Sequence, residues 1–500
     1  MKKTLLITII STTLLLAGNS PYDGENLHQN HSNLDKVLFI WDMYDAYESE
    51  KKRQENTEEK RLKKLNNSLN KKAIVTYQEK NITNKEFAPT DLQKKHFNQK
   101  QIKVNDKNLY PFTLLDSNLQ YFSMRQANEI AINSMLFISD YSNKLLAKYT
   151  DNIFLKILLN LALGIAYEES IDIWAHEEGH RSILTYHNIS SNNAWKDGAV
   201  DGVKTQTLND FKRDNFVDFI RLHTAGIESE AVLIEDFEER LMFEKHLDIS
   251  IYVPLWTHKY INYAYMHSAD AGDGMHYDKN DNYNNYNELM EPEKDRDIVG
   301  HDVYGFVRHL FTKNDVNYKK RYSNIDEFTP EQKSYHDKIV SRAWINFLDM
   351  NLFRMLYDKV DFYGYDVSAG FNYYLSPFGD VTDLNIITSS KESKNRLTLR
   401  KMDNYDNSFY AIQLKDYRRN FGDFWLTSTV NIWQNPKKFD FFTSEKFYGG
   451  SLSCNIEYKI NDIINISTRL LTKSKGFLPG VNDDNLKAMS SISAGIVIKY

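Results

Sequence analysis

The chain of 500 residues has a single cysteine, Cys454, and is poor in proline (9) and glycine (20). One cysteine excludes an intramolecular disulfide framework and a zinc finger built on cysteine ligands. The formal net charge of −6 is small for this length, which argues against nucleic acid as a partner. The mean hydropathy of −0.57 excludes a polytopic helical membrane protein. Aromatic residues are plentiful, with 32 tyrosines and 28 phenylalanines, and these suit large cores or membrane-interface belts.

The amino terminus is typical of a secretory signal peptide. Two lysines precede an apolar run over residues 5–16, and small residues follow up to Ser20. The run is too short to span a bilayer as a mature helix. Asn19 stands where a lipoprotein would need its acylated cysteine, so we expect no lipid anchor there. We predict that residues 1–20 are a cleaved signal and that the protein is exported into a bacterial cell envelope.

Composition and periodicity divide the rest of the chain into three parts. Residues 21–115 are polar and charged and indicate an N-terminal region or linker. Residues 116–358 carry apolar side chains at three- and four-residue spacing, which predicts a mostly helical domain. From residue 361 to 500 the period is two, broken by polar turn clusters, which predicts an antiparallel β domain. The predicted fold class is therefore α+β, with helices first and the sheet last.

The expected elements can be given by range. Helices are predicted over residues 126–149, 171–187, 208–247, 252–267, 297–311 and 335–357. Strands are predicted over residues 363–374, 383–388, 396–402, 408–415, 424–432, 447–458, 463–472 and 490–500. Eight strands are enough to close a small barrel.

The most informative motif is HEEGH, which runs from His176 to His180. On a helix, residues four apart lie on the same face, so both imidazoles can reach one ion. Imidazole nitrogens suit zinc, and a catalytic zinc takes three protein ligands and a water. Glu177 is placed to take a proton from that water. Gly179 inside the helix costs about 1 kcal/mol relative to alanine, which indicates that something packs closely there.

A third ligand is expected from the helix that follows. Here the chain resembles the gluzincin metallopeptidases, in which HExxH is followed on a later helix by a glutamate ligand. Glu228 to Ala231 match the E-x-x-A part of that second element, and the resemblance therefore implies Glu228 as the ligand. Val232 stands where the family usually has an aspartate that orients the first histidine, which puts catalytic competence in doubt. Helical periodicity favours Glu230 instead, because Glu230 falls inside an apolar stripe where a charge needs a partner.

Further histidines are candidates for stabilising an oxyanion during hydrolysis, namely His267, His301 and His309. A structural role is the competing interpretation for each of them. The chain contains no Gly-rich phosphate loop and no persuasive Ser/His/Asp arrangement.

Apolar and smaller or more polar side chains alternate along the last predicted strand, residues 490–500. Ile492, Ala494, Ile496, Ile498 and Tyr500 share one face, while the opposite face is smaller and more polar. This pattern resembles the closing strand of bacterial outer-membrane β-barrels, in which the apolar face points at lipid. The alternative is a soluble sheet that packs against the helical domain.

Together these features predict an exported zinc metallopeptidase of the bacterial outer membrane or periplasm. Its substrate would be a peptide or protein, and its β domain would contact the outer membrane. The alternative is a non-catalytic outer-membrane or surface protein with a degenerate zincin-like domain.

Overall fold

The computed structural model describes residues 109–116, 123–150, 152–195, 199–243, 249–271, 302–314, 328–354, 360–390, 393–480 and 486–499. All of them belong to one compact unit, Asn108–Arg354 with Lys359–Tyr500. The predicted signal peptide and nearly all of the polar N-terminal region lie outside the described residues.

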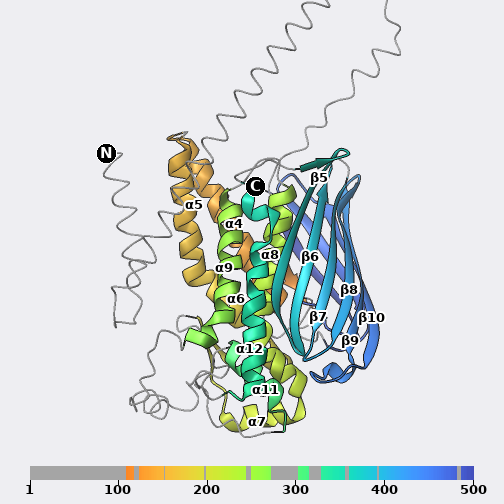
Figure 1. Ribbon diagram of the computed structural model, residues 1–500. Coiled ribbons are helices and arrows are strands. Elements are labelled where there is room, and N and C mark those ends of the chain that lie inside the picture. The colour runs from red at the N-terminus through yellow and green to blue at the C-terminus, as the bar shows by residue number, and fades with distance from the viewer. Residues whose placement is uncertain are drawn as a thin grey trace, which may run out of the picture. The chain divides into compact units, whose positions relative to one another are not determined.

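Helices occupy the first part of this unit, as the sequence predicts (Figure 1). Two begin with a capping box, in which Ser123 pairs with Gln126 and Thr329 with Gln332. The long helix predicted over residues 208–247 is divided in two at Asn215, which has a non-helical backbone. The helices are α4 (Met124–Ala147), α5 (Ile153–Tyr167), α6 (Ile173–Tyr186), α7 (Thr205–Asp214), α8 (Phe216–Phe243), α9 (Ile249–Ala271), α11 (Asp302–Phe311) and α12 (Pro330–Ala343), with short 3-10 turns η6 (Trp344–Phe347), η7 (Met350–Phe353) and η8 (Lys437–Phe439).

A ten-stranded antiparallel sheet follows, in the order β1-β12-β11-β10-β9-β8-β7-β6-β5-β4. From β4 to β12 each strand pairs with the next one in the sequence, so this part of the sheet is a continuous meander of hairpins. The strands are β1 (Leu109–Leu115), β4 (Val360–Phe362), β5 (Tyr365–Ser376), β6 (Gly379–Ser389), β7 (Lys394–Asp403), β8 (Ser408–Phe421), β9 (Phe424–Pro436), β10 (Lys446–Lys459), β11 (Ile464–Lys473) and β12 (Met489–Lys499). Strands β2 (Asn192–Ala194) and β3 (Ala199–Asp201) form a separate small hairpin.

The eight predicted strands are confirmed as β5 to β12, and two more were not foreseen. Short β4 extends one edge, and β1 comes from the stretch assigned to the polar N-terminal region and pairs with β12. The apolar run Leu109–Leu115 was hidden by its charged surroundings. Among the described strands, β1 and β4 are the two edges, so the sheet is not closed.

Side chains and turns from the helical part cover the free edges of the sheet. Beside β1, Glu129 of α4 accepts a hydrogen bond from the Thr113 amide at 2.7 Å, and Asn133 donates to the Pro111 carbonyl at 2.5 Å. At the other side, short β4 pairs only with the first residues of β5, and beyond it Asn346 of η6 accepts from the Tyr373 amide at 2.7 Å and donates to its carbonyl at 3.2 Å. These contacts satisfy backbone groups that an uncovered edge strand would leave unpaired.

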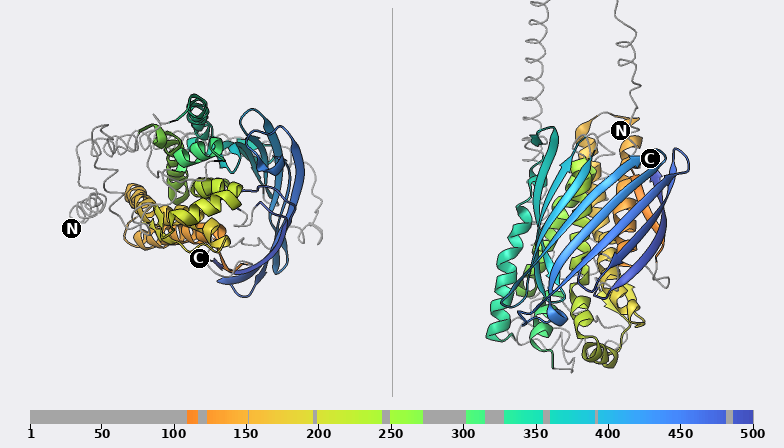
Figure 2. Two further views of the ribbon diagram at one scale, coloured as in Figure 1. Left: turned by 90° about the horizontal axis from the view of Figure 1, so that it is seen from below. Right: turned by 90° about the vertical axis from the view of Figure 1, so that its right-hand side faces the viewer.

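The sheet curves around α8, and charged residues join the two (Figure 2). Glu235 and Glu239 of α8 form ion pairs of 2.8 and 2.9 Å with Arg396 of β7, and Glu239 also pairs with Lys415 of β8 at 2.7 Å. The inward face of the sheet is therefore polar, and its charges are neutralised by the helix that it encloses.

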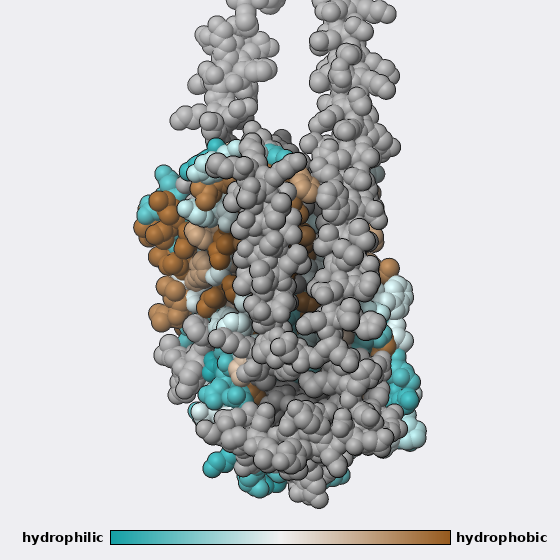
Figure 3. Space-filling model, turned by 90° about the vertical axis from the view of Figure 1, so that its left-hand side faces the viewer, coloured by the Kyte–Doolittle hydropathy of each residue, from teal (hydrophilic) through white to brown (hydrophobic). Residues whose placement is uncertain are grey.

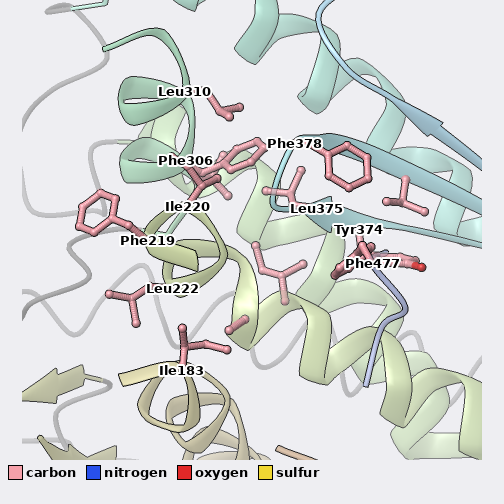
Figure 4. Packing of buried hydrophobic residues seen from close by; sticks show 14 of the residues in the cluster. Ile183, Phe219, Ile220, Leu222, Phe306, Leu310, Tyr374, Leu375, Phe378 and Phe477 are labelled. Carbon is pink, nitrogen blue, oxygen red and sulfur yellow. The ribbon is translucent and has the colours of Figure 1, made fainter. Parts of the chain in front are cut away.

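At one end of α8 the packing is apolar (Figure 4). Side chains of α8, α11 and the β5–β6 hairpin meet there with the loop before β12, and they include Phe219, Ile220, Phe306, Leu310, Leu375, Phe378 and Phe477. This cluster packs α11 against α8.

The outward face of the sheet is apolar. Leu414 of β8, Val430 of β9 and Leu452 of β10 are paired across neighbouring strands and are about half exposed. Leu470 of β11 is likewise paired with exposed Ile492 of β12. Figure 3 shows the opposite side of the molecule, where α5 lies, and hydrophobic residues gather in the upper part of that side as well. The exposed Ile492 and buried Ser493 lie on the faces expected from the alternation of the last strand.

The structure describes no helix that is both long enough and apolar enough to cross a membrane.

Candidate metal centre

The HEEGH motif lies on α6, which continues directly from α5 through a five-residue π-helical turn, Glu168–Asp172. Such turns insert an extra residue into a helix and are frequent at functional sites. Asp172, His176 and His180 follow one another at four-residue spacing and therefore lie on the same side of this helix. The predicted helix through the motif is confirmed.

Two glycines let α6 and α8 approach each other at the motif. A Cβ on Gly179 would lie 2.7 Å from the carbonyl oxygen of Ala225, which is closer than such atoms can pack. A Cβ on Gly226 would lie only 2.2 Å from Nε2 of His176. The expectation of close packing at Gly179 is confirmed, and Gly226 provides the space in which the His176 ring lies.

Both motif histidines meet the same carboxylate. Nε2 of His176 lies 3.1 Å from Oδ2 of Asp302, and Nε2 of His180 lies 3.2 Å from the same oxygen. Asp302 is the first residue of α11. All three side chains are at least nine-tenths buried.

The other ring nitrogen of each histidine faces an acceptor. Nδ1 of His180 is 2.5 Å from the carbonyl oxygen of Leu222 on α8, so it must carry the proton there. Nδ1 of His176 is 3.5 Å from Oε1 of Glu230. These partners leave Nε2 as the nitrogen that offers a lone pair toward Asp302, which is how second partners orient metal-binding histidines.

The three converging atoms fit a tetrahedral cation such as zinc. With bonds of about 2.0–2.1 Å to nitrogen or oxygen, neighbouring ligand atoms around tetrahedral zinc are about 3.3 Å apart. The two histidine–Asp302 separations, 3.1 and 3.2 Å, are close to that value. Two imidazoles and one carboxylate are also a donor set that catalytic zinc uses. The residues present therefore fit zinc.

Electrostatics at the group also favour a cation. Burial opposes the charged form of His176, but Tyr265 and the carboxylates of Asp302 and Glu230 raise the pKa of His176 well above its usual value. Burial likewise opposes the charged form of Asp302, and the two histidines outweigh it and lower the pKa of Asp302. Negative charge thus dominates the group, and a metal ion that binds there has to displace protons from the imidazoles.

Two further side chains stand at the group. Glu177 is buried and raises the pKa of His180, which indicates that its carboxylate is close to the ring. The ring centroid of Tyr265, on α9, lies 5.0 Å from that of His176. The charge of His176 lowers the pKa of the Tyr265 phenol, but burial and the surrounding carboxylates outweigh it and raise that pKa. The phenol therefore stays protonated at neutral pH.

The structure does not bring Glu228 to the histidines. Both of its oxygens lie 2.9 Å from the guanidinium of Arg221, and one of them also accepts from the Gly480 amide at 2.9 Å. Among the described residues, the groups suited to a metal ion are His176, His180 and Asp302, and Asp172, Glu230 and His258. Glu228 belongs to neither, so the assignment that followed from the motif finds no support in the geometry.

Glu230, the alternative, contacts His176 from the side away from Asp302. It lies against Nδ1, while the nitrogen that faces Asp302 is Nε2. The apolar-stripe argument placed Glu230 correctly toward α6, but Glu230 orients a histidine where a ligand was expected.

The second group is less suited to a metal. Oε2 of Glu230 is 2.6 Å from Nδ1 of His258, whereas Oδ1 of Asp172 faces Nε2 of the same ring at 3.8 Å. The two nitrogens of one imidazole point in different directions, so the two carboxylates cannot share one ion with this ring. The arrangement is better described as a carboxylate–imidazole–carboxylate chain.

Of the candidate oxyanion histidines, the two that the structure describes have their printed contacts away from the pair. His301 lies outside the described residues. His309 is near the far end of α11, where its Nδ1 is 3.0 Å from Lys212 and its ring stacks on His223. His267 packs against Tyr263 on α9. Tyr265 on that helix, which the sequence did not single out, is the group that contacts His176.

The close contact at Gly226 leads to a prediction. Replacing Gly226 with alanine is expected to push the His176 ring away from Asp302 and to weaken zinc binding at least tenfold. Gly164→Ala is the matched control, since a Cβ there meets only Val253 at 3.4 Å, and it should add up to about 1 kcal/mol of helix stability. Zinc titration of both variants checks this, and equal affinities would show that Gly226 does not hold the ring in place.

Comparisons of the chain with protein-family models, with curated proteins and with solved structures gave no match.

Proposed function

We propose that this chain is an exported zinc-dependent peptidase whose metal ligands are His176, His180 and Asp302. One observation carries the proposal. Both histidines of an HExxH helix have Nδ1 directed at an acceptor and Nε2 directed at one oxygen of Asp302. A histidine pair with only a structural role needs neither the shared oxygen nor the adjacent Glu177.

The side chains around the group suit hydrolysis of a peptide bond. Zinc, when bound, supplies Lewis acidity to a water molecule and to the scissile carbonyl. Glu177 would accept the proton of that water and deliver it to the leaving amine. Tyr265, kept protonated by its surroundings, would donate a hydrogen bond to the oxygen on which negative charge develops.

The test is metal-dependent proteolysis by the purified full-length protein. We expect cleavage of an unfolded protein such as casein, loss of cleavage on treatment with a chelator, and recovery on addition of one equivalent of zinc. Cleavage that persists in the metal-free protein would contradict the proposal.

Burial of the group favours a second candidate, a non-catalytic protein that uses the cation to hold α6, α8 and α11 together. His176, Glu177, His180 and Asp302 are all less than a tenth exposed. For this candidate, removal of zinc lowers the melting temperature, and no peptide is cleaved under any condition.

We also propose that the outward face of the sheet lies in the bacterial outer membrane. Its middle is aliphatic, with Leu414, Val430 and Leu452 side by side, whereas aromatic residues stand nearer the strand ends, as with Tyr448 and Tyr458 of β10. The ten residue steps from Tyr448 to Tyr458 span about 33 Å along a strand, or about 25 Å at the tilt usual in outer-membrane barrels, which matches the height of the apolar band of such barrels. The polar inward face supports the same interpretation.

A sheet that does not close can lie in a membrane if the backbone groups at its edges are hydrogen-bonded to other parts of the protein. In hydrocarbon an unpaired backbone group costs several kcal/mol. Hydrogen bonds with the side chains of Glu129 and Asn133 of α4 and of Asn346 of η6 satisfy backbone groups on β1 and β5. Helical segments would thus complete the wall that a closed barrel builds from strands alone.

Cys454, the only cysteine, provides a probe for this environment. It lies between outward-facing Leu452 and Ile456 on β10. An environment-sensitive fluorophore on Cys454 should shift to shorter wavelength in phosphatidylethanolamine/phosphatidylglycerol vesicles and should be quenched by lipids with a spin label on their acyl chains. The control is Cys454→Ser combined with Ser451→Cys, which moves the probe to the buried inward face. Quenching of the Cys454 probe by aqueous iodide, with no effect of the labelled lipids, would rule out this membrane contact.

A further inference from the structure

A buried chain of alternating carboxylates and imidazoles extends from the candidate metal centre into the protein. Beyond Asp302 and His176, Glu230 lies 3.5 Å from Nδ1 of His176 with one oxygen and 2.6 Å from Nδ1 of His258 with the other. On the far side of the His258 ring, Asp172 faces Nε2 at 3.8 Å. Five elements contribute to this chain, namely α11, α6, α8, α9 and the π-helical turn.

We propose that His258 and Asp172 are positioning residues that, through Glu230, fix the orientation and tautomer of His176 for zinc binding. This inference rests on the proposed metal centre and goes beyond it, because neither residue is a ligand. Glu230 alone has rotational freedom about its side-chain bonds. A hydrogen bond from His258 to one oxygen sets the plane of the carboxylate, so that the other oxygen faces Nδ1 of His176.

The surroundings of His258 support this role. The residue is fully buried, and its ring lies against Phe237 at 5.2 Å and Tyr167 at 6.1 Å between centroids. These contacts hold the ring in one plane with Nδ1 toward Glu230. Packing alone would be met by any aromatic residue, whereas the hydrogen bond with Glu230 requires a nitrogen at the Nδ1 position, and Nε2 faces the Asp172 carboxylate at the longer distance of 3.8 Å.

The π-helical turn accounts for the position of Asp172. Asp172 is the last residue of the turn and comes four residues before His176. It therefore lies on the side of the helix that carries both motif histidines. Val232 leaves no carboxylate at the position where the gluzincin pattern has one, and the chain of Glu230, His258 and Asp172 takes over its task from a different direction.

Two variants of His258 separate positioning from packing. His258→Phe keeps the aromatic volume and removes both nitrogens, and we expect it to weaken zinc binding about tenfold, the lower end of the range for groups that hold a metal-binding histidine. His258→Asn carries an N–H near the position of Nδ1 and should restore the affinity to within about threefold of the unaltered protein. Affinity is measured by competition with a chromogenic chelator, and the absorption spectrum of the cobalt-substituted protein reports the geometry of the ligands.

Each outcome decides the matter. Weakened binding in His258→Phe with recovery in His258→Asn supports positioning. Equal affinities in all three proteins, or equal losses in both variants, would overturn it. Should His258→Phe fail to fold, Asp172→Asn takes its place with an expected several-fold loss of zinc affinity, and an unchanged affinity would again overturn the proposal. Proteolysis is not a readout here, so a protein that binds zinc but cleaves nothing refutes the peptidase without affecting this test.

Discussion

Replacement of Asp302 with alanine is expected to lower zinc affinity by roughly a hundredfold or more. Binding free energies of about 10–16 kcal/mol for four-ligand zinc sites correspond to about 3 kcal/mol per ligand, which is more than a hundredfold in affinity. Asp302 is the group that both Nε2 atoms face, at 3.1 and 3.2 Å. Its loss also removes the charge that neutralises the bound cation. Isothermal titration of the metal-free protein measures the effect.

The chain contains a matched control for this variant. Asp218 of α8 pairs with Nε2 of His187, at the end of α6, at 3.0 Å. It is thus a histidine–aspartate pair that also involves α6 but belongs to neither metal group among the described residues. Asp218→Ala should bind zinc as the unaltered protein does. If the two aspartate variants lose affinity equally, Asp302 is not a ligand.

Replacement of Glu177 with glutamine is expected to reduce peptide hydrolysis by about 10²–10⁴-fold while zinc remains bound. Glutamine keeps the size and hydrogen-bonding capacity of the side chain but cannot take up a proton. Because Glu177 is close to the group but is not one of the three side chains that converge there, zinc affinity should change little. Initial cleavage rates and zinc content, measured on the same preparation, test both halves of this expectation.

Glu178 is the appropriate control for Glu177. Its carboxylate is held by Arg181, with bonds of 2.8 and 3.0 Å from Nε, and by Asn193 at 2.9 Å. These contacts turn it toward the β2–β3 hairpin, so Glu178→Gln should retain cleavage. A Glu177→Gln protein that still cleaves at the unaltered rate would remove the proposed proton acceptor from the mechanism.

The local parts of the structure could be read from the sequence because they depend on neighbours along the chain. The spacing of His176 and His180 requires a helix for both rings to share a face, and the helix is there. Alternation of apolar and polar residues located β5 to β12, since each strand pairs with the one before it. Strand β1 was not predicted, because its partner in the sheet, β12, lies almost at the other end of the chain.

The proposed third ligand, Asp302, could not be predicted either, because its contact with the motif also joins distant parts of the chain. Glu228 matches a motif, but its carboxylate is taken up by Arg221, two turns away on the same helix. The Arg221 guanidinium donates hydrogen bonds to both oxygens of Glu228. Asp302 follows the motif by more than a hundred residues and reaches it only through the packing of α11 against α8. No periodicity marks such a residue. An aspartate at the start of a helix is common, because its negative charge interacts favourably with the helix dipole.

The most direct measurement is the zinc content and coordination of the purified full-length protein, by elemental analysis and X-ray absorption spectroscopy. We predict one zinc per chain, bound by two imidazoles and oxygen ligands, and lost in His176→Ala, His180→Ala and Asp302→Ala but retained in Glu228→Gln. A protein that binds no zinc, or one whose zinc is lost in Glu228→Gln and retained in Asp302→Ala, would contradict the account.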